Sequence, residues 1–286
     1  MKFFIAIVFI FTQLSCSFNR IVSYSISGFI DETFVAVNEE SNLEIAKTSI
    51  ESNLKLLDGL LRIEPNDEHY LLLASQGYFG YSFSFVEDEN IEKAKLLYLR
   101  SKNFAETILK KKFNLTKKIS EHSLDEIEQI LNNATEKNVP EIFWFAISYG
   151  SYLNLDITNP DAIADIPKVE KMMMFVITKN ENYYYGSANF FMGTLYSIRP
   201  KMFGGDLEKS KTYFEKALKI NNRNFLFTQL YFAKFYAVNS LDNVLFENLI
   251  SEIENFDLEK FPEQKFANSI AKEKAKILKE RITDLF

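Results

Sequence analysis

Few side chains in this sequence have the types and spacings that catalysis or metal binding requires. The 286 residues include two histidines, His69 and His122, and one cysteine, Cys16. Neither histidine has a second plausible ligand at a metal-binding spacing such as H-E-x-x-H, and no G-x-S-x-G motif places a serine on a sharp turn. A cysteine–histidine nucleophile pair would need Cys16, which lies in the N-terminal segment. We therefore predict no catalytic residues, no metal and no cofactor.

Paired carboxylates could also act as general acids and bases. The runs with the right composition are Glu39–Glu40, Asp125–Glu126 and the stretch from Glu252 to Glu254. Each run lies among polar neighbours on an expected solvated face, where a carboxylate is hydrated and is not poised for proton transfer. The sequence therefore predicts a protein that is not an enzyme.

The overall charge argues against nucleic-acid binding. The chain carries 39 acidic and 33 basic side chains, for a formal net charge of -6. Capture of a phosphate backbone depends on a surplus of clustered lysine and arginine. We predict no nucleic-acid partner.

Aromatic residues are abundant and occur in runs. They make up 15% of the chain, including 28 phenylalanines and 14 tyrosines. Adjacent rings cannot all share one helix face, so some of them should line a groove, a pore or a contact with another subunit. Ordinary core packing is the alternative reading for each ring. The candidate groove residues are Phe143, Trp144, Tyr149, Tyr183, Tyr184, Tyr185, Phe190 and Phe191.

The N-terminus has the features of an export signal. Lys2 is followed by an apolar run over residues 3–11, and a small residue precedes Cys16. This run is too short to cross roughly 30 Å of hydrocarbon, but it is typical of a secretory signal. Cys16 stands where a bacterial lipoprotein is lipidated, so we predict a lipoprotein-type signal peptide over residues 1–16. The alternative is plain secretion. In the lipidated form, the chain would contact the membrane only through its N-terminal lipid.

The remaining chain divides into a linker and N-terminal segment over 17–40 and a helical domain over 41–286. Apolar residues recur at steps of three and four from Asn42 onward, and no stretch alternates convincingly at period two. The sequence therefore predicts an all-α fold. Expected helices span about 42–63, 68–85, 91–112, 140–153, 166–178, 184–198, 207–220, 225–238, 242–254 and 262–284.

Residues 189–222 partly match the tetratricopeptide pattern, in which a first helix carries Gly and Tyr and a second carries Phe and Ala. Gly193 and Tyr196 occupy the first-helix positions, and Phe214 and Ala217 occupy those of the second helix. The loop between the two expected helices is longer than the pattern allows. We therefore predict degenerate tetratricopeptide-like helical hairpins stacked into an α-solenoid or bundle.

The loop between these two helices runs from Pro200 to Asp206. Gly204 and Gly205 permit a positive φ in a tight turn, and Asp206 is suited to cap the helix that follows. A phosphate-binding loop is not expected here because the G-x-x-x-x-G-K pattern is absent.

Several motifs together resemble the TRAP transporter T-component (TatT) family. They are Pro140–Trp144, Gly186–Tyr196, the signature loop containing Pro200, Gly204, Gly205 and Asp206, Asn268–Ala271, and the terminal Asp284–Phe286. They keep the order of the family's motifs and span about residues 40–286.

This resemblance implies a tetratricopeptide-like lipoprotein of the periplasm, anchored to a membrane of the cell envelope. Its partner would be a solute-binding P component of a TRAP transporter, and it would pass a small, hydrophobic ligand toward a membrane permease. The resemblance also implies a homotrimer and carries over no catalytic residue. The alternative is a generic tetratricopeptide-like scaffold of the envelope that holds no small molecule.

Overall fold

The computed structural model describes residues 27–156 and 159–286, so the expected signal peptide and Cys16 lie outside the described residues. Within these ranges the structure contains helices and no β-strand, which confirms the predicted all-α fold. A first helix covers residues 27–38. It is followed by α2 (Leu43–Ile63), α3 (Glu68–Tyr81), α4 (Ile91–Lys112), α5 (Leu124–Asn132), α6 (Val139–Asn154), α7 (Pro160–Asn180), α8 (Ser187–Ile198), α9 (Leu207–Ile220), α10 (Phe227–Tyr231), α11 (Asn243–Asn255), α12 (Lys265–Glu280) and α13 (Ile282–Leu285).

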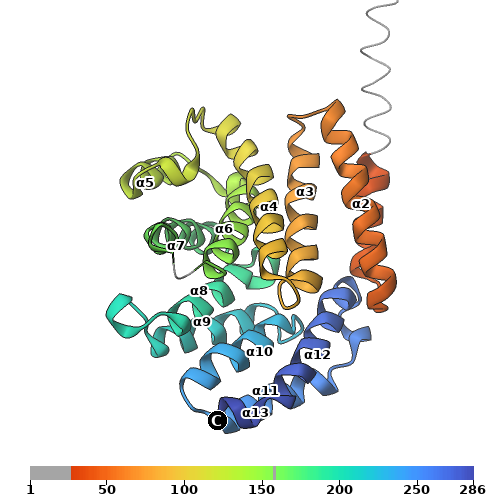
Figure 1. Cartoon of the computed structure of the whole chain (residues 1–286), viewed down its shortest axis with the longest axis vertical. Helices are drawn as coiled ribbons and strands as arrows, with labels where there is room; N and C mark the ends of the chain where they lie inside the picture. The colour runs from red at the N-terminus through yellow and green to blue at the C-terminus, as the bar shows by residue number, and fades with distance from the viewer. Residues whose placement is uncertain (1–26, 157–158) are drawn as a thin grey trace, which may run out of the picture.

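The helices form a curved row that turns back on itself. Helix α3 packs between α2 and α4, α6 packs between α4 and α7, and α8 pairs with α9. Figure 1 shows α2 at one side of the molecule, α5 and α7 at the other, and α9 to α13 below them. Helix α12 returns to contact α2, so the last helices close the row against the first. This closure encloses a space between segments that are distant in sequence.

Several helix starts follow from local hydrogen bonding. The side chains of Asn42, Asp67, Asn90 and Asp242 each accept a hydrogen bond from a backbone N–H in the first turn of the following helix. The helix predicted over 91–112 has those bounds in the structure.

Three local expectations were wrong. Helix α5, which begins with a capping box between Ser123 and Glu126, was not predicted, because only two of its nine residues are buried. Helix α7 starts at Pro160 instead of Ile166, because proline is tolerated in the first turn of a helix. The helix expected from Tyr184 starts at Ser187.

The two helices that match the tetratricopeptide pattern form a closely packed pair. A Cβ atom on Gly193 would lie 2.8 Å from the ring of Phe214, so only glycine lets α9 approach α8 this closely. The hydroxyl of Ser210 donates to the backbone carbonyl of Gly193 (2.7 Å). The residues matched in sequence therefore meet across this hairpin.

The signature loop joins α8 to α9 in a tight turn. Gly204 has a φ of 89°, and a Cβ atom on Gly205 would overlap the carbonyl oxygen of Arg199. Asp206 caps α9 by accepting a hydrogen bond from the backbone N–H of Lys209 (3.1 Å). Backbone conformation and capping thus explain both glycines and the aspartate.

Candidate functional site

A cleft of about 220 Å³ lies in the space that the closed row of helices encloses. Its walls come from the first helix over 27–38 and from α2, α3, α6, α7, α8, α10 and α12. Aromatic and aliphatic side chains provide most of the lining. Apolar cavities of about 150 Å³ bind molecules the size of benzene, so this space is large enough for a small apolar ligand.

Two phenylalanines on one helix form the long wall of the cleft. Phe79 lies on α3, and Phe83 lies on the π-helical turn Ser82–Val86 that extends α3. Their ring centroids are 5.4 Å apart and stacked, and the Phe83 ring also lies 4.8 Å from that of Phe227. A π-helical turn admits one extra residue per turn and often marks a functional site. Here it coincides with the lining of the cleft.

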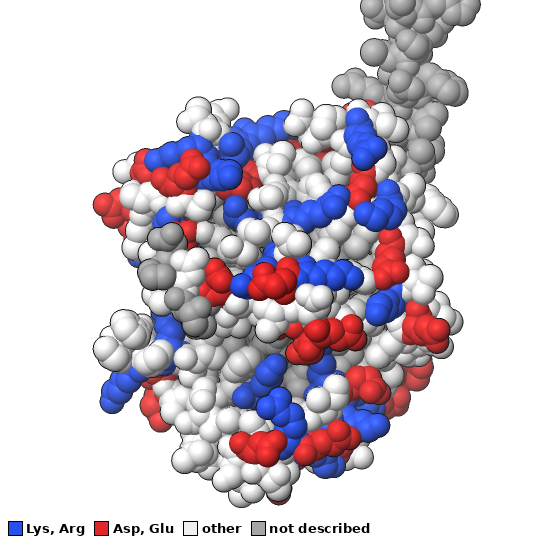
Figure 2. Space-filling view, in the orientation of Figure 1, with Lys and Arg blue, Asp and Glu red and all other residues white. Residues whose placement is uncertain are grey.

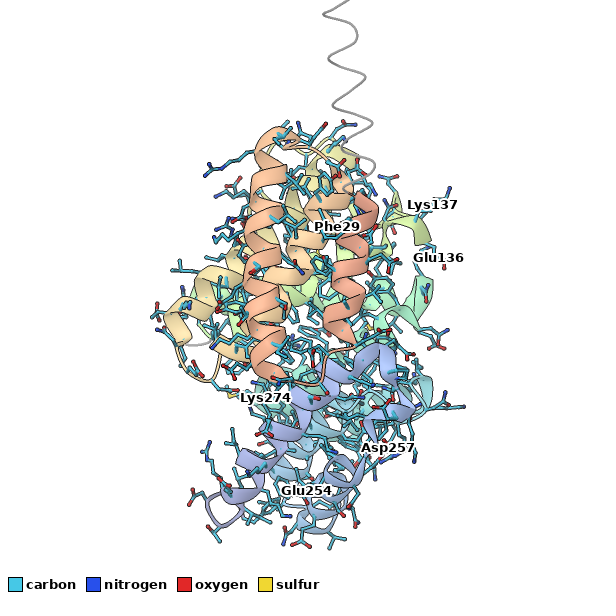
Figure 3. The ribbon with its side chains drawn as sticks, turned by 90° about the vertical axis from the view of Figure 1, so that its right-hand side faces the viewer. Phe29, Glu136, Lys137, Glu254, Asp257 and Lys274 are labelled. Carbon is cyan, nitrogen blue, oxygen red and sulfur yellow. The ribbon has the colours of Figure 1, made fainter. Side chains whose placement is uncertain are left out.

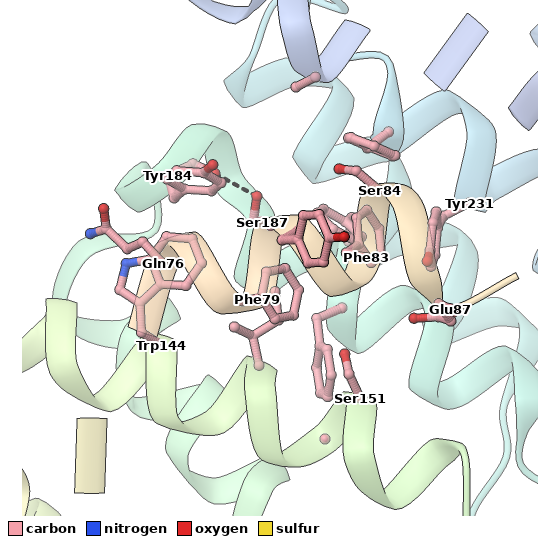
Figure 4. A pocket seen from close by; sticks show the side chains of 18 of the residues that line it. Gln76, Phe79, Phe83, Ser84, Glu87, Trp144, Ser151, Tyr184, Ser187 and Tyr231 are labelled. Atoms are coloured by element: carbon pink, nitrogen blue, oxygen red, sulfur yellow. Dashed lines mark hydrogen bonds between the residues drawn. The ribbon is translucent and has the colours of Figure 1, made fainter. Parts of the chain in front are cut away.

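One end of the cleft is formed by Trp144 and Tyr184, which Figure 4 shows on the same side of Phe79. Their rings meet edge to face, with centroids 4.9 Å apart. The indole N–H of Trp144 donates to the hydroxyl of Tyr183 (3.1 Å), which holds the indole in place. The indole N–H is therefore already paired, and the ring of Trp144 forms part of the cleft wall.

The turn before α8 positions Tyr184. Tyr184 and Tyr185 have φ angles of 45° and 61°, in the left-handed region that disfavours side chains with a Cβ atom. Such a conformation costs of order 1–3 kcal/mol per residue and persists only where surrounding packing imposes it. Tyr184 is 37% exposed although it lines the cleft, and the desolvation around it raises the pKa of its hydroxyl. Tyr184 thus contributes part of the cleft wall.

The structure divides the eight aromatic residues predicted for a groove into two sets. Trp144, Tyr184, Phe190 and Phe191 line the cleft. The other four lie elsewhere: Phe143, Tyr183 and Tyr185 pack behind the Trp144–Tyr184 end, and Tyr149 donates a hydrogen bond to Asp165 on α7. Runs of adjacent aromatic residues in the sequence thus do not show which rings face the cleft and which rings pack behind it.

The opposite end of the cleft contains residues that the sequence did not single out. Glu87 follows the π-helical turn, and Tyr231 ends α10; Figure 4 shows the two side chains close together on the far side of Phe83 from Trp144. The hydroxyl of Tyr98 donates to Oε2 of Glu87. No sequence motif could have found Glu87, because its surroundings come from α4, α10 and α12.

Charges near Glu87 act in opposite directions. Burial raises the pKa of Glu87, whereas the Tyr98 hydrogen bond and the nearby Lys274 and Lys234 act to lower it. Lys274 forms a salt bridge with Asp88, and its ammonium lies 5.8 Å from the centre of the Phe83 ring. Figure 3 shows Lys274 where α12 meets the N-terminal helices. This ion pair therefore joins α12 to the turn that follows the π-helical segment beside the cleft.

The described residues contain no group of three or more His, Cys, Asp or Glu side chains that could hold a metal ion. The face of the molecule in Figure 2 carries interleaved basic and acidic side chains, without one dominant sign. Over the described ranges, no helix is long and apolar enough to cross a membrane.

Comparison with known proteins decides the family. A family model described as TRAP transporter T-component matches residues 39–286. The chain belongs to the TRAP transporter T-component family. This T component is also similar to a protein of Treponema pallidum (strain Nichols) described as uncharacterized, with 21% identity over 273 residues that cover 90% of this chain and 84% of that protein. The family assignment makes the T component part of a transport system, and the matched region contains every lining residue of the cleft except Phe34, Val37 and Asn38.

Proposed function

We propose that this T component binds the solute-binding P component of a TRAP transporter and passes a small apolar ligand toward the membrane permease. The observation that carries the ligand part is the aromatic cleft of about 220 Å³ enclosed by the fold. Ligand sites are concave and mostly apolar, with a few polar groups, and this cleft has that character. The proposal that the partner is a P component rests on the family assignment alone.

We also propose that the chain works in the periplasm, anchored to a membrane by a lipid on Cys16, and that it assembles as a homotrimer. The apolar run before Cys16 supports export and anchoring. A lipid on Cys16 would keep the cleft close to a membrane that holds the permease. The trimer rests on the resemblance to the family.

The first experiment is a pull-down from envelope extract with residues 17–286, which include the whole described fold. Bound proteins and extracted small molecules are identified by mass spectrometry. Recovery of a P component together with an apolar molecule is the expected result. Recovery of unrelated envelope proteins without any ligand would favour the alternative, a scaffold lipoprotein, and would contradict the transport role.

A variant that fills the cleft separates ligand binding from binding of the P component in the same experiment. Ser151 lies on the cleft wall, and the Ser151→Leu side chain would occupy part of the cleft without altering the outer surface. This variant should still recover the P component but should lose the small molecule. Loss of both from a folded Ser151→Leu chain would mean that partner binding depends on the cleft.

A further inference from the structure

The polar end of the cleft holds a carboxylate with unused hydrogen-bonding capacity. Oε2 of Glu87 accepts a hydrogen bond from Tyr98, while Oε1 accepts none from any described residue. A carboxylate can accept several hydrogen bonds, and a desolvated one that lacks them carries a large free-energy penalty. Because Glu87 lines the cleft, a ligand there can supply the missing donor.

Two hydroxyl groups on the cleft wall also have unused hydrogen-bonding capacity. Neither the hydroxyl of Tyr231 nor that of Ser151 forms a hydrogen bond with the described part of the chain. Both residues lie on the Glu87 side of Phe79 in Figure 4. The cleft therefore has several free polar groups at its Glu87 end, while at its Trp144 end the aromatic rings lie beside the amide of Gln76.

The free oxygen of Glu87 discriminates between ligands that can donate a hydrogen bond and ligands that cannot. Lys274 is engaged by Asp88, and Lys234 lies over the Phe235 ring at 5.3 Å from its centre. An ionised ligand carboxylate has no proton to donate to Oε1 of Glu87, because it is an acceptor only. A hydroxyl or an ammonium group would instead donate to Oε1 of Glu87.

We propose that the cleft selects an elongated apolar molecule that ends in a hydrogen-bond donor, a hydroxyl or an ammonium group. The donor binds Oε1 of Glu87, and the apolar body lies along Phe83 and Phe79 toward Trp144. This inference rests on the proposed ligand-carrying function and adds the chemical class of the ligand.

The only tryptophan of the chain, Trp144, lines the cleft, so its fluorescence reports on cleft occupancy. The mature chain, residues 17–286, is titrated at pH 7 with 1-decanol, decylamine and decanoate, which share one alkyl chain and differ in the end group. Decanol and decylamine should bind at least about tenfold more tightly than decanoate, because only they can donate to Glu87.

The Glu87→Gln variant tests the residue itself. It keeps the shape of the side chain and removes the charge, so decylamine should lose about tenfold in affinity, and the gap between decylamine and decanoate should shrink. Glu89→Gln, on the same turn but exposed, is the matched control and should leave all three affinities unchanged.

The outcomes separate this inference from the proposed function. Equal binding of the three compounds by the unaltered chain would overturn the inference and leave a ligand-binding cleft. Tighter binding of decanoate would also overturn it. If none of the compounds changed the fluorescence of Trp144, both the inference and the ligand-carrying role would fail. The titrations of the unaltered chain remain decisive if Glu87→Gln does not fold.

Discussion

Helix α6 separates two regions that are built from similar residues but differ in how completely they are packed. Toward α4, the hydroxyls of Ser148 and Ser101 lie 2.6 Å apart, and Ser101 also donates to the backbone carbonyl of Ser75 (2.6 Å). Toward the cleft, the hydroxyl of Ser151 has no described hydrogen-bond partner. Three residues along one helix thus separate a filled interior from an open one.

The filled interior on the α4 side of α6 also contains a buried ion pair. Lys102 and Glu106 lie on α4 with side chains 6% and 7% exposed, and Nζ of Lys102 lies 3.0 Å from Oε2 of Glu106. Oε1 of Glu106 accepts a hydrogen bond from the backbone N–H of Ile119 (2.6 Å). In this region both carboxylate oxygens are paired, whereas Glu87 in the cleft keeps one oxygen free. The comparison teaches that the carboxylate in the filled interior is paired at both oxygens, whereas the carboxylate on the cleft wall keeps one oxygen that a ligand can reach.

The largest expected effect comes from breaking the buried ion pair. Glu106→Ala leaves the ammonium of Lys102 buried without its partner, which should lower the free energy of unfolding by about 3–5 kcal/mol. Chemical denaturation measures this change. Glu92→Ala, on the same helix, is the control: it removes a carboxylate that is 82% exposed and pairs with Lys95, and it should cost less than about 1 kcal/mol. Similar losses in both variants would contradict the closed packing of the α4 side.

The two serines of α6 provide a matched pair. Ser148→Leu forces a larger side chain into a filled site and should cost about 1–3 kcal/mol of stability. Ser151→Leu places the same side chain in the cleft and should change stability by no more than about 0.5 kcal/mol, while it abolishes decanol binding. Equal destabilisation by the two substitutions would mean that the cleft has no room for a ligand.

A pH dependence is expected from Tyr183, which packs behind the Trp144–Tyr184 end of the cleft. Burial raises the pKa of Tyr183 from 10.0 to about 12, although the hydrogen bond from Trp144 acts to lower it. The folded state therefore keeps this proton after the unfolded state has lost it, so the associated stability is present below pH 10 and is lost as the pH rises toward 12. The difference corresponds to at most about 2.7 kcal/mol at 1.36 kcal/mol per pKa unit.

Tyr183→Phe isolates this contribution. Denaturation at several pH values from 9 to 12 should show a shallower loss of stability in Tyr183→Phe than in the unaltered chain, on top of a pH-independent cost for the unpaired indole N–H of Trp144. Parallel curves for the two proteins would show that Tyr183 ionises at the same pH in the folded and unfolded states.

Local sequence signals predicted much of the secondary structure. Helix α4 has the predicted bounds because Asn90 caps its start and apolar residues recur at helical spacing up to Lys112. The turn at Gly204 and the cap at Asp206 follow from the same kind of local rule. These features depend on residues within a few positions of one another, so the sequence is sufficient to predict them.

The cleft depends on contacts that no local pattern records. Tyr184 reaches it through a left-handed turn that surrounding packing imposes, Phe79 reaches it from α3, and Glu87 reaches it from the turn after the π-helical segment. Half of the predicted groove rings line the cleft, and the others support it from behind or pack on the far side of α6.

The sequence by itself determined an all-α chain, its main helix boundaries and its family, because helical periodicity and capping act over short distances and motif order is preserved along the chain. Only the tertiary structure decided which rings face the cleft and which carboxylate lies at its polar end. The reason is that α12 must return to α2 before Phe83, Tyr231 and Trp144 can enclose one space.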